Sequence, residues 1–148
     1  MTEKLLDESI RQQVQELFQG FTNPIQVLFF GSETNCDYCE DTLKLIQEVA
    51  ELSEKIKLSV YDLSKNAGLA KQYNVDKAPM LVIAGLDGDK VIDYGVRFAG
   101  IPAGHEFSSL IHVLVMVSSR DSTLREKTRQ ALRELKEPIH LQVFITPT

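Results

Sequence analysis

Both cysteines of the chain lie in one short stretch, and this pair constrains the fold more than any other feature. The 148-residue sequence contains only Cys36 and Cys39, separated by two residues. An apolar, β-favouring run covers 25–31 just before the pair, and apolar residues recur at helical spacing over 41–52 just after it. A Cys-x-x-Cys pair between a strand and a helix is typical of a redox site.

The position of the pair predicts a role for each cysteine. The positive end of a helix stabilises an anion, which favours the thiolate of Cys36 as the nucleophile. Cys39 lies one turn later, where it would attack a mixed disulfide on Cys36 and release the reduced substrate. We therefore predict that Cys36 and Cys39 are the catalytic residues, with Cys36 accessible to solvent and Cys39 largely buried.

The alternative for the pair is half of a zinc site, which needs two further ligands at suitable spacing. There is no third cysteine, and the three histidines, His105, His112 and His140, are scattered singly. We expect no metal ligand and no cofactor. The remaining alternative is a zinc-binding dimer, in which each chain contributes one Cys-x-x-Cys. Metal analysis would test it.

Charge and composition limit the classes of molecule that the chain is expected to bind. The net charge is -5 and there is no basic run, which argues against nucleic acid and anionic membrane surfaces. Residues 1–20 lack the long apolar core of a secretory signal, and no apolar run approaches membrane-spanning length. Two closely spaced cysteines fit a reducing compartment. We expect a cytoplasmic protein that acts on a protein partner or a small thiol.

Hydrophobic periodicity predicts an alternating order of helices and strands. Expected helices cover 4–19, 41–52, 67–73 and 105–117, and expected strands cover 25–31, 57–62, 78–84 and 90–94. The strand at 25–31 is apolar throughout, so it should be central and buried on both faces. The glycine-rich stretch 95–104 is expected to be a loop. The predicted fold class is α/β, a central four-stranded mixed sheet flanked by helices.

This order, with Ala78-Pro79 opening the third strand, resembles the thioredoxin fold over residues 1–118. The resemblance implies that the Ala78–Pro79 bond is cis and faces the disulfide, and that the backbone of Ala78 pairs with an extended substrate segment. The alternative for Pro79 is a plain edge-strand proline. Tyr38 either shapes the rim over Cys36 or only covers the helix start. The predicted substrate-binding residues are Tyr38, Ala78 and Pro79.

Within that superfamily the chain resembles the glutaredoxin-like protein disulfide oxidoreductases, which have two tandem thioredoxin-fold units. The residues that carry the likeness are Asn35-Cys36-Asp37-Tyr38-Cys39, Tyr61-Asp62, Ala78-Pro79 and Gly95-Val96-Arg97-Phe98-Ala99-Gly100-Ile101-Pro102-Ala103-Gly104-His105-Glu106-Phe107. The amino-terminal domain of the flavoprotein that reduces alkyl-hydroperoxide reductase is built similarly, although its first unit generally lacks the cysteine pair. The resemblance implies disulfide-containing protein substrates and a thiol or flavoprotein reductase as electron donor.

Two positions depart from thioredoxin, which has a buried Asp six residues before its nucleophile and a Trp just before it. This chain has Phe30 and Asn35 there, so the usual proton acceptor for the buried cysteine is absent. Asp62 and Glu33 are candidate substitutes, or are only solvated.

Acidic residues surround the nucleophile. The stretch between 31 and 43 contains no Lys or Arg, and its acidic residues are Glu33, Asp37, Glu40 and Asp41. Nearby negative charge disfavours a thiolate. We therefore predict that Cys36 is less acidic than in strongly oxidising Cys-x-x-Cys proteins, and that the pair is a reductant.

Two functions compete on these observations. The first is a dithiol–disulfide oxidoreductase that reduces or exchanges protein disulfides through the cysteine pair. The second is a thioredoxin-fold docking or electron-relay module of a larger reductase system.

Residues 119–148 repeat the beginning of the chain. An offset of 114 maps Pro24-Ile25 onto Pro138-Ile139 and Phe29-Phe30 onto Val143-Phe144. We therefore expect a thioredoxin-like domain at 1–118, followed at 119–148 by the start of a second, incomplete unit with an extra helix near 124–135 and a strand at 141–145. An apolar strand with free edges seeks a partner. Residues 139–146 are thus predicted to pair with a strand of the same sheet or of a second copy, forming a homodimer.

Overall fold

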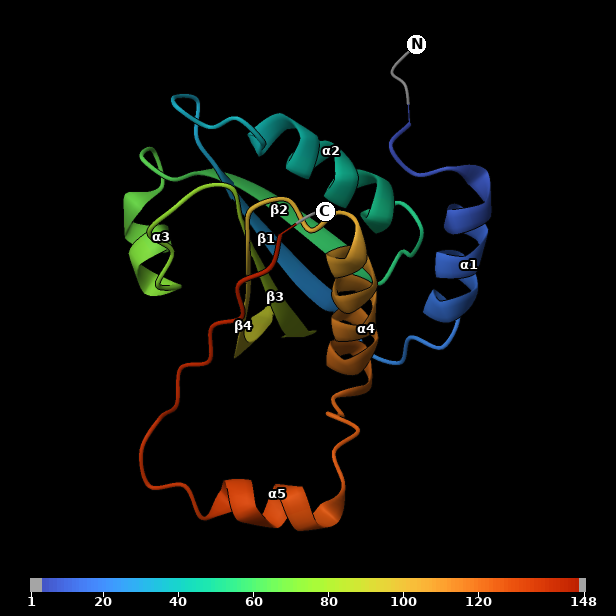
Figure 1. Cartoon of the computed structure of the whole chain (residues 1–148), viewed down its shortest axis with the longest axis vertical. Coiled ribbons are helices and arrows are strands. Elements are labelled where there is room, and N and C mark those ends of the chain that lie inside the picture. The colour runs from blue at the N-terminus through green and yellow to red at the C-terminus, as the bar shows by residue number, and fades with distance from the viewer. Residues whose placement is uncertain (1–3, 147–148) are drawn as a thin grey trace.

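The computed structural model describes residues 4–146 and shows an α/β fold built on a four-stranded sheet (Figure 1). Its strands are β1 (Ile25–Gly31), β2 (Ile56–Asp62), β3 (Met80–Asp87) and β4 (Lys90–Ala99). They lie in the order β2-β1-β3-β4. β1 pairs in parallel with β2 and antiparallel with β3, and β4 is antiparallel to β3. The predicted mixed sheet is confirmed.

Five helices precede, connect or follow these strands in the described part of the chain. They are α1 (Glu8–Phe18), α2 (Cys39–Ala50), α3 (Ala67–Gln72), α4 (His105–Ser119) and α5 (Glu126–Arg133). α1 begins after Asp7, whose side chain accepts a hydrogen bond from the backbone N–H of Ile10 at 2.8 Å and so caps the helix. No helix within residues 4–146 has the length and apolar character needed to cross a bilayer.

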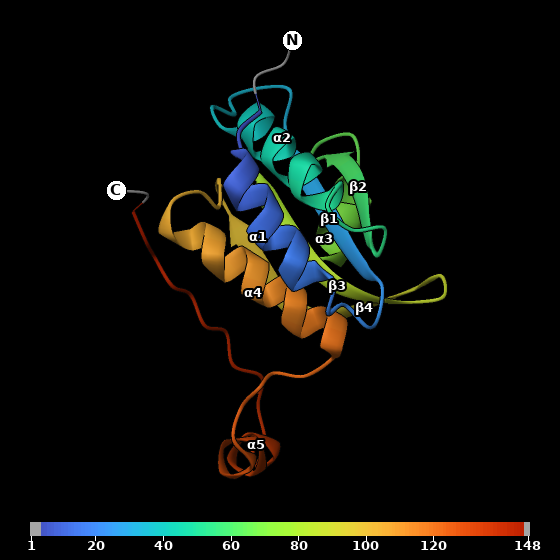
Figure 2. The same cartoon turned by 90° about the vertical axis from the view of Figure 1, so that its right-hand side faces the viewer.

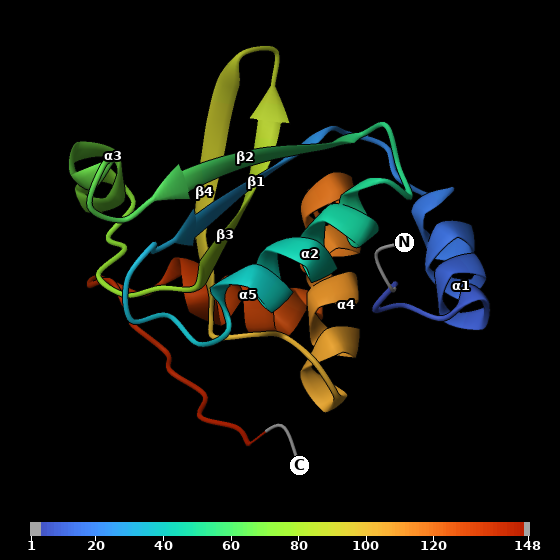
Figure 3. The ribbon, with the colours of Figure 1, turned by 90° about the horizontal axis from the view of Figure 1, so that it is seen from above.

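The two faces of the sheet are covered by different helices. Alternate residues of β1 point to opposite faces, so Val27 and Phe29 enter one core while Leu28 and Phe30 enter another. α1, α2 and α4 pack on the first core, and α3 covers the second (Figures 2 and 3). All seven residues of β1 are buried, which confirms its predicted central place.

The expected loop at 95–104 is wrong in its first half, because β4 continues to Ala99. The register of β3 against β4 shifts between Ile83 and Ala84, where Ile83 faces Val96 and Ala84 faces Asp93. Gly95 lies in this irregularity with a φ of 82°. A glycine inside a strand often marks a β-bulge, so the strand bends here and resumes.

The strand expected at 141–145 is also wrong for the isolated chain. The helix near 124–135 is present as α5, but residues 138–146 form neither helix nor strand. Figure 1 shows α5 lying away from the packed helices and sheet, and Figure 2 shows the segment after it running clear of them. A strand exists only through hydrogen bonds to a neighbouring strand. Alternating apolar residues were therefore insufficient to predict one in this segment.

Candidate redox site

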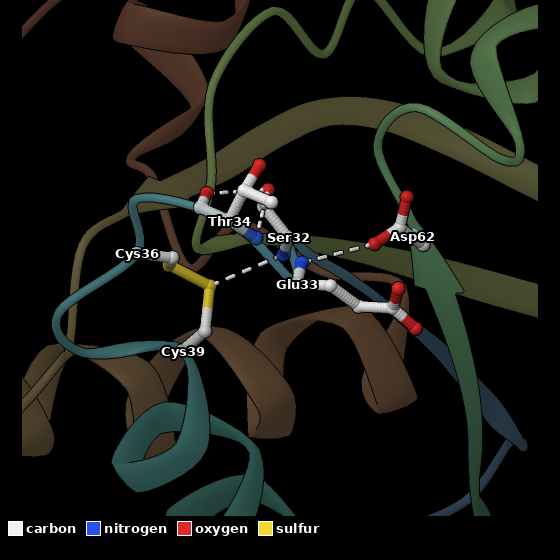
Figure 4. Close-up of a disulfide and its surroundings, with 6 residues drawn as sticks. All are labelled: Ser32, Glu33, Thr34, Cys36, Cys39 and Asp62. Carbon is white, nitrogen blue, oxygen red and sulfur yellow. Dashed lines mark hydrogen bonds between the residues drawn. A yellow bond between two sulfur atoms is a disulfide. The ribbon is translucent and has the colours of Figure 1, made fainter.

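Cys36 and Cys39 form a disulfide at the junction of β1 and α2 (Figure 4). Their Cα atoms are 5.5 Å apart. Cys39 is the first residue of α2, Tyr38 is its N-cap, and Cys36 lies in the turn before the helix. The sequence correctly placed the pair between a strand and a helix, but the helix begins at the second cysteine.

The expected contrast in burial between the cysteines is wrong for the disulfide form. Both residues are partly buried, although only Cys39 packs against the core formed by α1, α2 and α4. The reason is that the helix begins at Cys39 itself. Because Cys39 occupies the first turn of α2, no preceding turn covers it, and the loop that carries Cys36 leaves part of it open to solvent.

The sulfur of Cys39 lies close to the end of β1. The backbone N–H of Ser32 donates a hydrogen bond to the Sγ of Cys39 at 3.3 Å. A Cβ added to Gly31 would lie 2.7 Å from Cε1 of Phe29 and 3.7 Å from the Sγ of Cys39. The missing side chain therefore leaves room for the ring of Phe29 and for the sulfur of Cys39 beside the end of the strand.

Asp62 organises the loop before the cysteines and is a poor candidate for the proton acceptor. Its carboxylate accepts hydrogen bonds from the backbone N–H groups of Glu33, Ser64 and Lys65 and from the Ser64 hydroxyl. These bonds, the one from the Ser64 hydroxyl foremost, lower the pKa of Asp62 to about 2. A carboxylate with such a low pKa is a weak base. Figure 4 shows Ser32 and Glu33 between Asp62 and the disulfide.

Glu33 is likewise engaged, because its carboxylate forms an ion pair with the ammonium group of Lys65. The hydrogen bond to Glu33 and its negative charge raise the pKa of Lys65. The sequence does not reveal Lys65 as a partner, because it lies far from Glu33 in the chain and outside residues 31–43. The signal that would have found it is the parallel pairing of Gly31 with Asp62, which brings the loops after both strands together.

The predicted substrate-binding residues border the same edge of the sheet. The Ala78–Pro79 bond is cis, as expected. Phe30 pairs with Met80, so Pro79 precedes β3 at the edge where β1 ends and the cysteine loop begins. Within residues 4–146, no hydrogen bond engages the backbone N–H or C=O of Ala78. Tyr38 is 57% exposed and makes no side-chain capping bond, so its ring is open to a ligand.

Arg97 holds the segment that leads to Ala78, a role that the sequence did not reveal. Its guanidinium donates to the backbone C=O of Tyr73 at 3.1 and 2.8 Å and to the carboxylate of Asp93 at 2.9 and 2.8 Å. The hydrogen bond from Arg97 lowers the pKa of Asp93, helped by the backbone N–H of Gly95. The bulged β4 is thus fixed to the end of α3, from which residues 74–79 continue.

In the part of the chain that the structure describes, no three side chains among His, Cys, Asp and Glu gather in a way that would hold a metal ion. His105, His112 and His140 are all exposed. Nothing in the described residues therefore supplies the further ligands that a zinc site in one chain would need.

Comparison with known sequences identifies a domain and several longer relatives. Residues 24–112 match the family model described as a thioredoxin domain. The chain is 29% identical over 144 residues to a protein named NADH dehydrogenase of Bacillus subtilis, covering 97% of this chain and 25% of that protein. A protein named as a subunit of alkyl hydroperoxide reductase, from Staphylococcus epidermidis, is 26% identical, with the same coverage of 97% and 25%. The chain spans a quarter of the length of these relatives.

Solved structures show similarity to the same kinds of protein. A protein disulfide oxidoreductase from Aeropyrum pernix matches with a TM-score of 0.75 and 33% identity, over 90% of this chain and 57% of that chain. One subunit of the alkylhydroperoxide reductase of Enterococcus faecalis matches with a TM-score of 0.77 and 27% identity, over 88% of this chain and 61% of that chain. From its cysteine pair, its sheet and the match over residues 24–112, the chain belongs to the thioredoxin domain family.

Proposed function

We propose that this chain is a protein disulfide oxidoreductase that reduces or exchanges disulfides of protein substrates through Cys36 and Cys39. The observation that carries the proposal is the disulfide between two partly exposed cysteines at the end of a central strand. A disulfide that solvent can reach exchanges with external thiols more readily than a buried one. The similarity to a protein disulfide oxidoreductase at 33% identity supports the same activity.

The proposed reaction has two exchange steps. The thiolate of Cys36 attacks one sulfur of the substrate disulfide, forms a mixed disulfide and releases the first substrate thiolate. The thiolate of Cys39 then attacks the Sγ of Cys36, so that the second substrate thiolate leaves and the Cys36–Cys39 bond forms. The substrate gains two electrons and the cysteine pair loses them. A thiol or a flavoprotein reductase must then return the pair to the dithiol form.

We propose that the substrate docks along Ala78. Its unengaged backbone N–H and C=O suit an extended peptide, which binds to such groups as an added strand would. The next residue, Pro79, is buried, and the exposed ring of Tyr38, between the two cysteines in the chain, offers apolar contact.

The test is reduction of a model protein disulfide by dithiothreitol with and without the chain. We expect acceleration by the wild type, none by Cys36→Ser, and accumulation of a mixed disulfide with substrate by Cys39→Ser, detected by mass spectrometry. A wild-type rate equal to that of dithiothreitol alone would contradict the proposal.

The second candidate is an electron-relay or docking module of a larger reductase system. It is favoured by the four-fold greater length of the curated relatives, of which this chain covers 25%, and by the name of one as a subunit of alkyl hydroperoxide reductase. Rapid exchange of the cysteine pair with glutathione, combined with no acceleration of protein disulfide reduction, would favour this function over the first.

We propose that residues 1–118 form the redox domain and that 119–148 correspond to the first helix and strand of a second thioredoxin-like unit. The repeated residues and the alignments over 144 residues support this division.

The homodimer through 139–146 is supported by the exposure of Leu141, Val143 and Phe144, at 85%, 86% and 89%. Cysteine usage supports a reducing compartment such as the cytoplasm.

A further inference from the structure

Thr42 carries a buried hydroxyl without a hydrogen-bond partner within residues 4–146. Its side chain is 0% exposed, and it lies in α2. A second unpaired buried atom in the same residues, Nη1 of Arg11, belongs to a guanidinium that lies within 4 Å of Glu48 and Glu51. Burying a hydroxyl without a partner costs free energy, so such a group in a folded protein requires an explanation.

The position of Thr42 relates this hydroxyl to the redox pair. Thr42 lies three residues after Cys39 in the same helix. Helical residues three apart lie on one face with Cβ atoms about 5–6 Å apart, and helical side chains tilt toward the N-terminus. The side chain of Thr42 is therefore directed toward the turn that contains Cys39. A threonine in a helix ordinarily bonds a carbonyl one turn back, but the Thr42 hydroxyl makes no such bond.

The groups around Cys39 show which hydrogen-bond partners its sulfur has and lacks. The Ser32 N–H donates to its sulfur, and Cys39 opens α2, where backbone N–H groups lack helical acceptors. The two carboxylates considered as proton acceptors, Glu33 and Asp62, are occupied by Lys65 and by the loop. In the disulfide form, the bond to Cys36 fixes the sulfur in place. Cleavage of that bond frees the sulfur to rotate and gives it negative charge.

We propose that the Thr42 hydroxyl donates a hydrogen bond to the Sγ of Cys39 when the disulfide is reduced, and that Thr42 thereby sets the redox equilibrium of the pair. Thr42 is a positioning residue in this scheme, and the inference rests on the proposed redox function of Cys36 and Cys39. The hydroxyl is unpaired only in the oxidised form. Its burial therefore penalises the disulfide, and its bond to sulfur stabilises the dithiol.

The balanced reaction with glutathione shows where the hydroxyl acts. A glutathione thiolate attacks the Sγ of Cys36, and the electron pair of the broken bond passes to the Sγ of Cys39. The Thr42 hydroxyl donates to this thiolate and keeps its own proton. A second glutathione thiolate attacks the glutathione sulfur of the mixed disulfide, which releases Cys36 and forms glutathione disulfide. Two glutathione molecules are oxidised, and their protons pass to the protein thiolates or to solvent.

The experiment compares Thr42→Val with Thr42→Ser in the full chain. Valine keeps the branched shape and removes the hydroxyl, whereas serine keeps the hydroxyl. Each protein is equilibrated with glutathione buffers of known ratio, and the dithiol fraction is measured by trapping. We expect Thr42→Val to lower the equilibrium constant for reduction roughly tenfold, a shift of about 30 mV toward a more negative potential. Thr42→Ser should remain close to the wild type.

The other outcomes are equally decisive. A Thr42→Val potential equal to that of the wild type, or more positive, overturns the inference. If the wild type fails to equilibrate reversibly with glutathione, the redox function fails and the inference fails with it. Urea unfolding of both forms provides an independent measurement, in which Thr42→Val should stabilise the oxidised form relative to the reduced form. If the valine variant does not fold, Thr42→Ala undergoes the same comparison, and an unchanged oxidised-to-reduced difference refutes the role of the hydroxyl.

Discussion

The carboxylate of Asp62 accepts a hydrogen bond from the backbone N–H of Glu33 at 3.2 Å, which ties the end of β2 to the loop that carries Cys36. Gly31 and Asp62 are paired at the ends of the two parallel strands, so the two loops leave the sheet side by side. The same carboxylate also caps the turn at Ser64 and Lys65. One side chain therefore fixes both loops at the redox edge of the sheet.

The first prediction is that Asp62→Asn loosens the cysteine loop in a pH-dependent way. The pKa of Asp62 is lowered from 3.8 to about 2, so its stabilising effect is complete above the unfolded value and is lost as pH falls through the folded value. Thermal unfolding of wild type and variant should differ most above about pH 5, and the difference should shrink steadily as pH falls toward 2. A difference that does not shrink on acidification, or that is absent at pH 7, would refute this anchoring role.

The second prediction is that alkylation of the reduced protein modifies Cys36 before Cys39. Cys39 packs against the core and accepts the Ser32 N–H, whereas Cys36 lies in the turn before α2. Brief treatment with iodoacetamide followed by peptide mass spectrometry measures the order. Preferential labelling of Cys39 would reverse the proposed roles of nucleophile and resolving cysteine.

The third prediction is that the Cys36 thiol is less acidic than in strongly oxidising Cys-x-x-Cys proteins, whose thiol pKa lies several units below the roughly 8.5 of free cysteine. Glu33 is paired with Lys65 and contributes little negative charge, so the charge that opposes the helix dipole comes from the acidic residues beside Cys36. Asp37 and Glu40 remain exposed. The ultraviolet absorbance of the thiolate, followed as pH rises, reports the titration. A value several units lower would contradict the prediction, and Asp37→Asn should lower the pKa relative to the wild type.

The fourth prediction is that Arg97→Met weakens both the fold and substrate docking. The substitution removes the charged donors to Tyr73 and Asp93, and hydrogen bonds to charged groups are worth about 1.5–3 kcal/mol. Urea unfolding should show a loss on that scale, and KM for a protein disulfide should rise more than kcat falls. Arg97→Lys is the matched control, and it should recover only part of both effects, because lysine lacks the forked donor geometry.

The fifth prediction concerns the apolar segment 139–146. If it pairs with a second copy, the full chain elutes as a dimer on sizing, and amides within this segment are protected from hydrogen exchange. Val143→Asp, which places a charge where the side chain is 86% exposed in the single chain, should produce a monomer without changing the fold. A full chain that is monomeric, with an unprotected segment, would exclude this dimer.

Most of the fold was predictable because the sequence patterns of its helices and strands lie within short segments of the chain. The continuous apolar run of β1 and the helical spacing of α2 follow from burial, and the cis Ala78–Pro79 bond followed from the resemblance. The extension of β4 beyond Gly95 was missed because a bulge and a loop share the same residue chemistry. The strand expected at 141–145 failed because strand formation depends on a partner that local sequence does not contain.

At the candidate site, the sequence located the two cysteines but not the residues that hold their loop. The roles of Asp62, Lys65 and Arg97 depend on contacts between segments far apart in the chain. The unpaired state of the Thr42 hydroxyl depends on side-chain positions that no spacing rule supplies. Residues that meet through strand register or helix packing are visible only after the fold is known.

The absent side chain at Gly31 fixes where the reactive loop can be joined to the scaffold. An alanine there would place its Cβ 2.7 Å from the ring of Phe29, a residue that is 3% exposed and has little room to move. The sequence after Ser32 is less constrained at Thr34 and Asp37, which are exposed, whereas Asn35 has a φ of 53° that few residue types adopt readily. An engineer who transplants a different loop onto this protein must keep the glycine and a residue that tolerates positive φ, whereas the other exposed positions are open to redesign.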